Sequence, residues 1–229
     1  MAKIDLIIDH TKKWEGGLSN ASTDTASKDA SPYIYKGVYG WHTNRGITYT
    51  AFKNGAETLG YKDTADNFLK MPDDIWLKIA KVKYWDTLDL DSLDSQAIAN
   101  LLFSWTWAGG SGYKKRISSY LKSKGIEWND KKPAELTAAI NLLIKKIGEQ
   151  KVFIDLMDQY KSFYKGMPEK SNPKTEKHPE GIYTKGWLNR LEDLKTFSTN
   201  FLGKTAKKAI PIALILALAV GAYFFFKRK

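Results

Sequence analysis

Two short motifs, one at each end of residues 14–48, contain the side chains best suited to chemistry. Trp14-Glu15-Gly16-Gly17 directly follows an apolar helical period, so the Glu15 carboxyl group is expected at a helix end beside the indole of Trp14. A carboxyl group shielded from water by an aromatic ring has its charged form disfavoured, as a general acid working near neutral pH requires. Taken alone, Glu-Gly-Gly is more often a solvated helix terminus with a flexible exit.

The second motif, Thr43-Asn44-Arg45-Gly46-Ile47-Thr48, closes a long irregular segment. Residues 16–46 are rich in Gly, Ser, Thr, Asn and Asp. A loop of this length inside a compact domain is usually functional or disordered, and its aromatic residues favour an ordered loop with at most a small hairpin. The polar side chains of the motif suit hydrogen bonds to water or sugar hydroxyls, or to the loop itself.

The elements that must position these motifs are predicted to be helical, because apolar residues recur at three- and four-residue steps and no convincing alternating strand appears. The fold class is therefore mainly α. Helices are predicted over residues 4–14, 49–59, 65–70, 73–85, 93–108, 113–124, 133–147, 150–164 and 185–201.

Residues 209–226 carry no charge, and an α-helix of that length spans about 27 Å, close to the hydrocarbon thickness of a bilayer. Basic residues flank this run on both sides, at Lys207-Lys208 and at Lys227-Arg228-Lys229. This pattern predicts one C-terminal transmembrane helix with the lipid bilayer as partner, although the balanced flanks give no orientation. The N-terminus has early charges and an amphipathic period, so no cleavable signal peptide is expected.

The composition excludes several kinds of site. The chain has no cysteine, which excludes disulfides and thiol nucleophiles, and its three histidines have no metal-ligand spacing, so no metal or organic cofactor is expected. The net charge of +11 falls to +5 for residues 1–202, because residues 203–229 hold six basic residues and no acidic one. A mildly basic domain suits an anionic partner such as cell wall, phospholipid or nucleic acid and does not choose among them. No nucleic-acid-binding signature accompanies the charge, so no nucleic-acid partner is expected.

Together, Glu15-Gly16-Gly17, Asp24, the 43–48 motif and Gly186-Trp187-Leu188-Asn189-Arg190 resemble glycoside hydrolase family 108, the N-acetylmuramidases of phages and bacteria. The resemblance covers residues 4 to about 195. It implies a lysozyme-like helical fold that hydrolyses the β-1,4 bond between N-acetylmuramic acid and N-acetylglucosamine in peptidoglycan. It also implies a catalytic domain (1–110) and a helical peptidoglycan-binding-like part that closes the same globule (111–202). The transmembrane anchor with its basic flanks (203–229) lies beyond the resemblance and is predicted from the apolar run alone.

The resemblance implies that Glu15 protonates the leaving oxygen and that Asp24 activates water or stabilises the developing positive charge. An insertion from about Thr25 to Trp41 replaces the Gly-Gly that usually follows the Asp, so Asp29 is an alternative to Asp24. Ser104 stands where the family usually has an Asp. Substrate contacts are expected from these side chains, the tryptophans as stacking surfaces for sugar rings: Asp29, Trp41, Thr43, Asn44, Thr48 and Trp107.

Two other functions remain open. A lytic transglycosylase would cut the same bond with Glu15 alone, acting first as acid and then as base. An inactive descendant would bind peptidoglycan or serve as a structural membrane protein of a virion. For the hydrolase, the resemblance favours a phage-encoded enzyme of wall penetration or lysis. A tethered enzyme suits local perforation, which favours the virion membrane over the host inner membrane.

Overall fold

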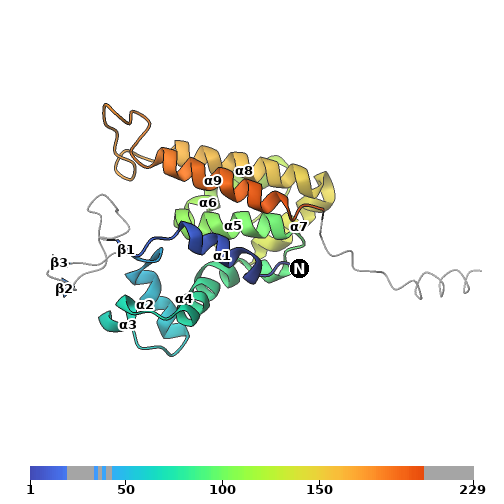
Figure 1. Cartoon of the computed structure of the whole chain (residues 1–229). Helices are drawn as coiled ribbons and strands as arrows, with labels where there is room; N and C mark the ends of the chain where they lie inside the picture. Colours follow the sequence, from blue (N-terminus) through green and yellow to red (C-terminus); the bar gives the residue numbers. More distant parts are fainter. Residues whose placement is uncertain (20–33, 36–37, 40–42, 204–229) are drawn as a thin grey trace, which may run out of the picture.

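The computed structural model describes residues 1–19, 34–35, 38–39 and 43–203 (Figure 1). Within these ranges the chain is mainly helical, as its periodicity predicts, and each predicted helix there has a counterpart. The α-helices of this part of the chain are α1 (Asp5–Trp14), α2 (Tyr49–Thr58), α3 (Ala65–Leu69), α4 (Asp73–Ala80), α5 (Gln96–Gly109), α6 (Tyr113–Ser123), α7 (Glu135–Ile147), α8 (Glu149–Lys165) and α9 (Thr184–Thr199).

Short strands form two small antiparallel sheets within the described ranges. The first has the order β1 (Leu18–Ser19), β4 (Thr43–Asn44) and β5 (Ile47–Thr48). The second is a hairpin of β2 (Ile34–Tyr35) and β3 (Val38–Tyr39). The sequence allowed at most a small hairpin within the loop, and this β2–β3 pair is one. The three-stranded sheet was not predicted, because strands of two residues are too short to show an alternating pattern.

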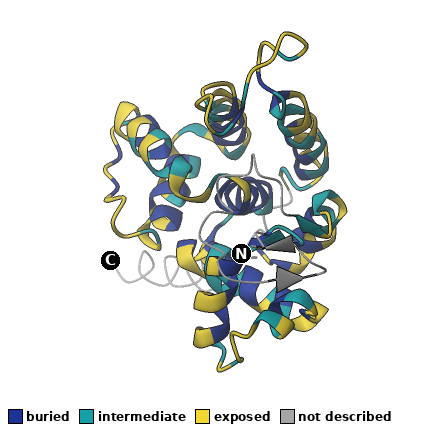
Figure 2. Ribbon diagram, turned by 90° about the vertical axis from the view of Figure 1, so that its left-hand side faces the viewer, coloured by how far each residue is buried: buried dark blue, intermediate teal, exposed yellow. Residues whose placement is uncertain are grey.

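Helix α5 lies at the centre of the molecule, and every side chain from Ala97 to Trp107 is buried. Figure 2 shows it as a dark helix surrounded by helices with exposed outer faces. Such a helix is apolar on all sides because it contacts neighbours all round. Helices α8 and α9 pack against α5 and against each other, as Figure 1 shows. One apolar core thus includes residues from both α1 and α9.

The start of α1 is tied to the start of α5. The backbone nitrogen of Ala2 donates to the carbonyl of Leu93 at 3.0 Å. The Gln96 side chain accepts from the backbone nitrogen of Lys3 at 2.7 Å and donates to its carbonyl at 3.0 Å. Because α1 is fixed at its beginning, its other end, at Glu15, has a defined position beside the far end of α5.

The predicted helix over residues 73–85 is divided into two elements. The α-helix ends at Ala80, and Lys81–Trp85 forms a π-helical turn, η2. A π turn contains more residues than an α turn, so the side chains beyond Ala80 depart from the predicted spacing. This wider turn places the ring of Tyr84 with its centroid 4.8 Å from that of Trp107. Such turns are frequent at functional sites.

The helix predicted over residues 93–108 begins later than expected, at Gln96. The Ser95 hydroxyl accepts a hydrogen bond from the backbone nitrogen of Ile98 at 3.2 Å, so Ser95 is its N-cap. Leu93 is extended and precedes the cap. The apolar side chain of Leu93 is nevertheless buried, which explains why the periodicity extended to it.

No helix among the described residues is long and apolar enough to cross a bilayer. The transmembrane helix predicted for residues 209–226 lies outside these residues.

Helix α9 is fastened to α1 through Asp193. Its carboxylate accepts a hydrogen bond from Trp14 Nε1 at 2.6 Å and lies 3.3 Å from Lys13 Nζ and 3.0 Å from His10 Nε2. The His10 ring stacks on Phe197 with centroids 4.5 Å apart. Burial lowers the pKa of His10 below its ordinary value of 6.5, although Asp193 partly opposes this shift.

We expect this histidine to weaken the fold in acid. Because its pKa is lower in the folded chain than in the unfolded chain, the stabilising effect of the neutral ring is complete above pH 6.5 and is lost as pH falls toward the folded value. His10→Gln removes this titration. The difference in Tm between the wild type and the variant should therefore shrink from pH 8 to pH 5. A difference that stays constant over this range would contradict the prediction.

Candidate active site

Glu15 follows the last residue of α1 with an extended backbone, at φ −92° and ψ 124°. Its side chain is 10% exposed, so it does not point into open solvent. Its Oε1 atom accepts a hydrogen bond from Trp107 Nε1 at 2.8 Å and lies 2.7 Å from Arg190 Nη2. One oxygen of the carboxylate is therefore fixed by two donors, from α5 and α9.

The indole beside Glu15 is that of Trp107 and not, as expected, that of the adjacent Trp14. Trp14 turns its Nε1 toward Asp193. Trp107 was expected to offer a stacking surface for a sugar ring, but its residue is only 7% exposed. Its ring packs against Tyr84 and Trp76, with centroids 4.8 and 5.2 Å away. The structure thus gives Trp107 a positioning contact with Glu15 in place of a surface role.

Arg190 is an important side chain of the site that sequence reasoning missed. The sequence placed it in the late Gly-Trp-Leu-Asn-Arg motif but assigned it no role, and on its own it indicated an exposed arginine near the start of a helix. Its side chain is only 15% exposed and reaches Glu15 from the first half of α9. Burial opposes its charge, but the Glu15 carboxylate, together with Tyr160 and Tyr164, outweighs burial and raises the pKa of Arg190. Arg190 therefore stays protonated, and with Trp107 it stabilises negative charge on Glu15.

The 43–48 motif forms a two-residue turn between β4 and β5. Arg45 and Gly46 both have positive φ, at 49° and 78°, as the tight hairpin turns that fit twisted strands require. The Arg45 guanidinium bonds to the Asp73 carboxylate and to the Met71 carbonyl. The carbonyl of Arg45 accepts from Trp76 Nε1 at 2.9 Å. These contacts fix the turn against the start of α4.

Gly46 brings this turn against the Glu15 carboxylate. A Cβ atom on Gly46 would lie only 2.6 Å from Glu15 Cδ and 2.8 Å from Trp107 Nε1. No side chain fits there, and the backbone conformation also favours glycine. Because Gly46 has no side chain, the Glu15 Oε2 atom can lie directly against its backbone.

Gly46→Ala should displace the Glu15 carboxylate and lower kcat about 10²-fold, because such a misplacement of a reacting group has this effect. Gly60→Ala is the matched control: Gly60 also has positive φ, at 64°, but nothing lies within 4 Å of its Cβ position. Both variants carry similar backbone strain. A comparable loss of activity in Gly60→Ala would show that strain, and not displacement of Glu15, causes the effect.

Asn44 and Thr48, two of the predicted substrate contacts, use their side chains for hydrogen bonds within the fold. Asn44 is buried, and its Nδ2 atom donates to the carbonyl of Phe68 at 2.6 Å. The Thr48 hydroxyl accepts from the backbone nitrogen of Ala51 at 3.1 Å and caps α2. Thr43 is half-buried in β4, directly opposite Thr48. Thr43 as a substrate contact stays a prediction.

The predicted second carboxylate and one stacking residue cannot be placed. Asp24, Asp29 and Trp41 lie outside the described residues. Ser104, which stands where an Asp was expected, is buried, and its backbone carbonyl accepts from the Tyr160 hydroxyl at 3.0 Å. Within the described ranges, no group of three or more His, Asp or Glu side chains could hold a metal ion.

The site therefore joins a mostly buried carboxylate, two donors on one of its oxygens, and a glycine turn beside the other. Residues 8–110 match the family model of glycosyl hydrolase 108. The chain is a glycoside hydrolase. The matched segment contains Glu15, Gly46 and Trp107, whereas Arg190 lies beyond it. The remaining contact to Glu15 is thus supplied by the C-terminal half.

A solved structure shows that the likeness in fold extends past this segment. The structure of SagA from Brucella abortus is similar with a TM-score of 0.59 and 17% sequence identity, covering 89% of this chain and 95% of that chain. At this identity the likeness concerns the fold. A comparison with curated proteins gave no significant match.

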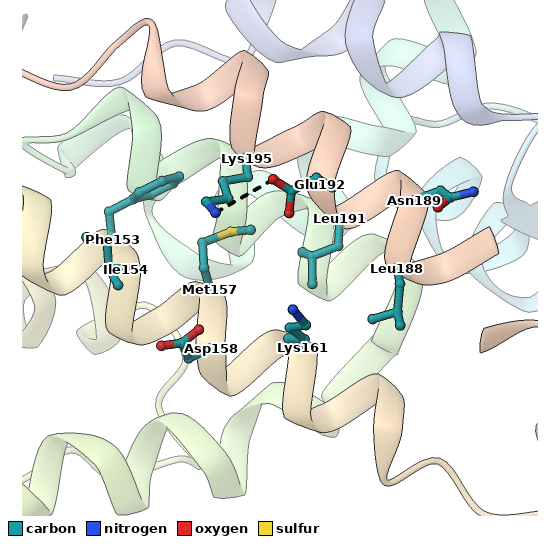
Figure 3. A pocket seen from close by; sticks show the side chains of 10 residues that line it. All are labelled: Phe153, Ile154, Met157, Asp158, Lys161, Leu188, Asn189, Leu191, Glu192 and Lys195. Carbon is teal, nitrogen blue, oxygen red and sulfur yellow. Dashed lines mark ion pairs between the residues drawn. The ribbon is translucent and has the colours of Figure 1, made fainter. Parts of the chain in front are cut away.

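A depression of about 380 Å³ between α8 and α9 is separate from the Glu15 site (Figure 3). Helix α9 lines it with Leu188, Leu191 and Lys195, which share one face of the helix. Arg190 and Asp193 lie on another face and contact Glu15 and α1. Helix α9 therefore stands between this depression and the carboxylate.

Proposed function

We propose that the chain is an N-acetylmuramidase that hydrolyses the β-1,4 bond between N-acetylmuramic acid and N-acetylglucosamine in peptidoglycan. One observation carries the proposal: Glu15 has one oxygen held by Trp107 and Arg190, and its other oxygen faces the bare backbone of Gly46. The match to glycosyl hydrolase 108 supports this substrate class.

In the proposed mechanism Glu15 is the general acid. Because Oε1 already accepts from two donors, Oε2 is the oxygen that holds the proton and delivers it to the leaving glycosidic oxygen. Negative charge forms on Glu15 as the proton leaves. Arg190 and Trp107 are already aligned to stabilise that charge, without rearrangement during the reaction.

A second carboxylate would activate water or stabilise the oxocarbenium-like centre. We propose Asp24 for this role, with Asp29 as the alternative. Its separation from Glu15 would set the stereochemistry: roughly 6.5 to 9.5 Å leaves room for an inverting water, and about 5 to 5.5 Å corresponds to retention.

Mass spectrometry of digested, purified peptidoglycan tests the proposal. Hydrolysis by the wild-type protein is expected to give fragments that end in reducing N-acetylmuramic acid. Fragments with anhydro ends would instead identify a lytic transglycosylase that uses Glu15 alone. No release of fragments would identify an inactive, peptidoglycan-binding or structural descendant.

We also propose that residues 209–226 attach the enzyme to a membrane, because this apolar run has basic residues at both ends. A phage-encoded enzyme carried in the virion membrane would act locally on the wall at entry, whereas one in the host inner membrane would act at lysis. Fractionation of purified particles, probed for this chain, separates the two. Its absence from particles would favour lysis.

A further inference from the structure

A groove of about 490 Å³ lies between the first half of α6 and the last half of α8, and it is distinct from the depression between α8 and α9. Two glycines keep it open. A Cβ on Gly112 would clash with the Phe163 ring, whose Cζ atom would be 2.7 Å away, and one on Gly166 would lie 3.2 Å from Arg116 Nη2. The groove is lined by Gly112, Lys115, Arg116, Ser119, Gln159, Phe163, Gly166, Met167 and Pro168.

The charge of this groove is positive and is not neutralised by neighbours. Lys115 and Arg116 line the groove from the start of α6, where there is no acidic residue in the first turn, and Lys114 precedes them on the side of a different depression. None of the ion pairs formed among the described residues includes any of these three. Cations at this end of a helix oppose its dipole, so they do not stabilise α6. Their placement favours an anionic ligand.

The groove adjoins the Glu15 site through the ends of α5 and α8. Gly109, two residues after Trp107, has Phe163 within 2.9 Å of its Cβ position. The Phe163 ring also packs against Trp105 of the same helix, with centroids 5.9 Å apart. Phe163 is therefore both a wall of the groove and a neighbour of the end of α5 that carries Trp107, the residue that donates to Glu15.

We propose that this groove binds the carboxylates of the peptide stems that branch from the muramic acid residues of peptidoglycan. This inference rests on the proposed function. The Arg116 guanidinium matches a carboxylate with two parallel hydrogen bonds, and Lys115 supplies a second positive charge. Phe163 and Met167 offer apolar contacts to alanine methyl groups. The other depression has Asp158 and Glu192 beside its lysines, so it lacks this excess of positive charge.

The test compares two charge-reversal pairs in the full-length chain carrying Glu15→Gln, which binds without cutting. Lys115→Glu/Arg116→Glu alters the proposed groove, and Lys161→Glu/Lys195→Glu makes the same charge change in the other depression. The ligands are purified peptidoglycan free of teichoic acid and the same material stripped of its stems by an amidase. We expect the first pair to weaken binding to stem-bearing peptidoglycan about tenfold or more, since charge-assisted hydrogen bonds have this strength.

The first pair should leave binding to stripped glycan unchanged and should reduce the salt dependence of binding to the stem-bearing form. The control pair should change neither. An equal loss on both ligands, no loss, or a larger loss in the control pair would overturn the proposal. Lys115→Gln/Arg116→Gln replaces the first pair if circular dichroism shows misfolding. Because binding is measured without catalysis, wild-type protein that releases no fragments would refute the muramidase and leave the stem site standing.

Discussion

Replacing Glu15 with Gln is expected to lower kcat on purified peptidoglycan about 10³-fold, the typical contribution of a positioned general acid. Gln keeps the size of the side chain and an oxygen that can accept from Trp107 Nε1 and from Arg190, although Arg190 loses its countercharge and the variant should be less stable than the wild type. It has no proton to deliver to the leaving oxygen. The measurement is the rate of release of new reducing ends, with circular dichroism to show that the variant is folded.

Glu192→Gln is the matched control, because it makes the same chemical change on an exposed part of α9, where Glu192 is 3.6 Å from Lys195. Its activity should equal that of the wild type. If Glu15→Gln released reducing ends as fast as the wild type, Glu15 could not be the general acid, whatever the activity of Glu192→Gln.

Replacing Arg190 with Met should have the second largest effect, because it acts on both stability and catalysis. The Glu15 carboxylate would lose its countercharge at a mostly buried position, and α9 would lose a contact to α1. Removing one partner of a buried ion pair costs about 3 kcal/mol. Removing an electrostatic stabiliser of the reacting group should also lower kcat about 10²-fold. Thermal unfolding and the rate of reducing-end release measure the two effects.

A double-mutant cycle separates these two roles. Glu15→Gln/Arg190→Met removes both charges, so it should be more stable than Arg190→Met alone, yet it should be as inactive as Glu15→Gln. Arg190→Lys keeps the charge without the planar fork and should retain part of the activity. Additive changes in stability would show that the two side chains do not interact in solution.

The elements that the sequence predicted correctly are those set by local periodicity. Helix α1 shows this well, because its apolar side chains at three- and four-residue steps fix both its face and its end at Glu15. The same pattern predicted α5 through α9 within a few residues. The π turn after Ala80 could not be predicted, since the apolar spacing of residues 73–85 fits a continuous α-helix and does not indicate the wider turn that sets Tyr84 against Trp107.

The candidate site was only partly predictable. Polar residues in the 43–48 motif suggested substrate contacts, but the Asn44 side chain ties β4 to the end of α3 and Thr48 caps α2. The position of Thr48 just before a helix was a recognisable capping signal. Arg190 meets Glu15 from the opposite end of the chain, and its only sequence signal was membership of the late motif. Contacts of this kind depend on tertiary packing.

The most direct test of Glu15 as proton donor varies the leaving group of the substrate. In a dinitrophenyl β-glycoside of a GlcNAc–MurNAc oligosaccharide, the leaving group is dinitrophenolate, which departs without being protonated. The sugar leaving group of the natural substrate requires protonation. The rates of wild type and Glu15→Gln should be measured on both substrates. If Glu15 is the general acid, the variant should lose about 10³-fold on the natural oligosaccharide and far less on the dinitrophenyl glycoside. An equal loss on both substrates would contradict the proton-donor role.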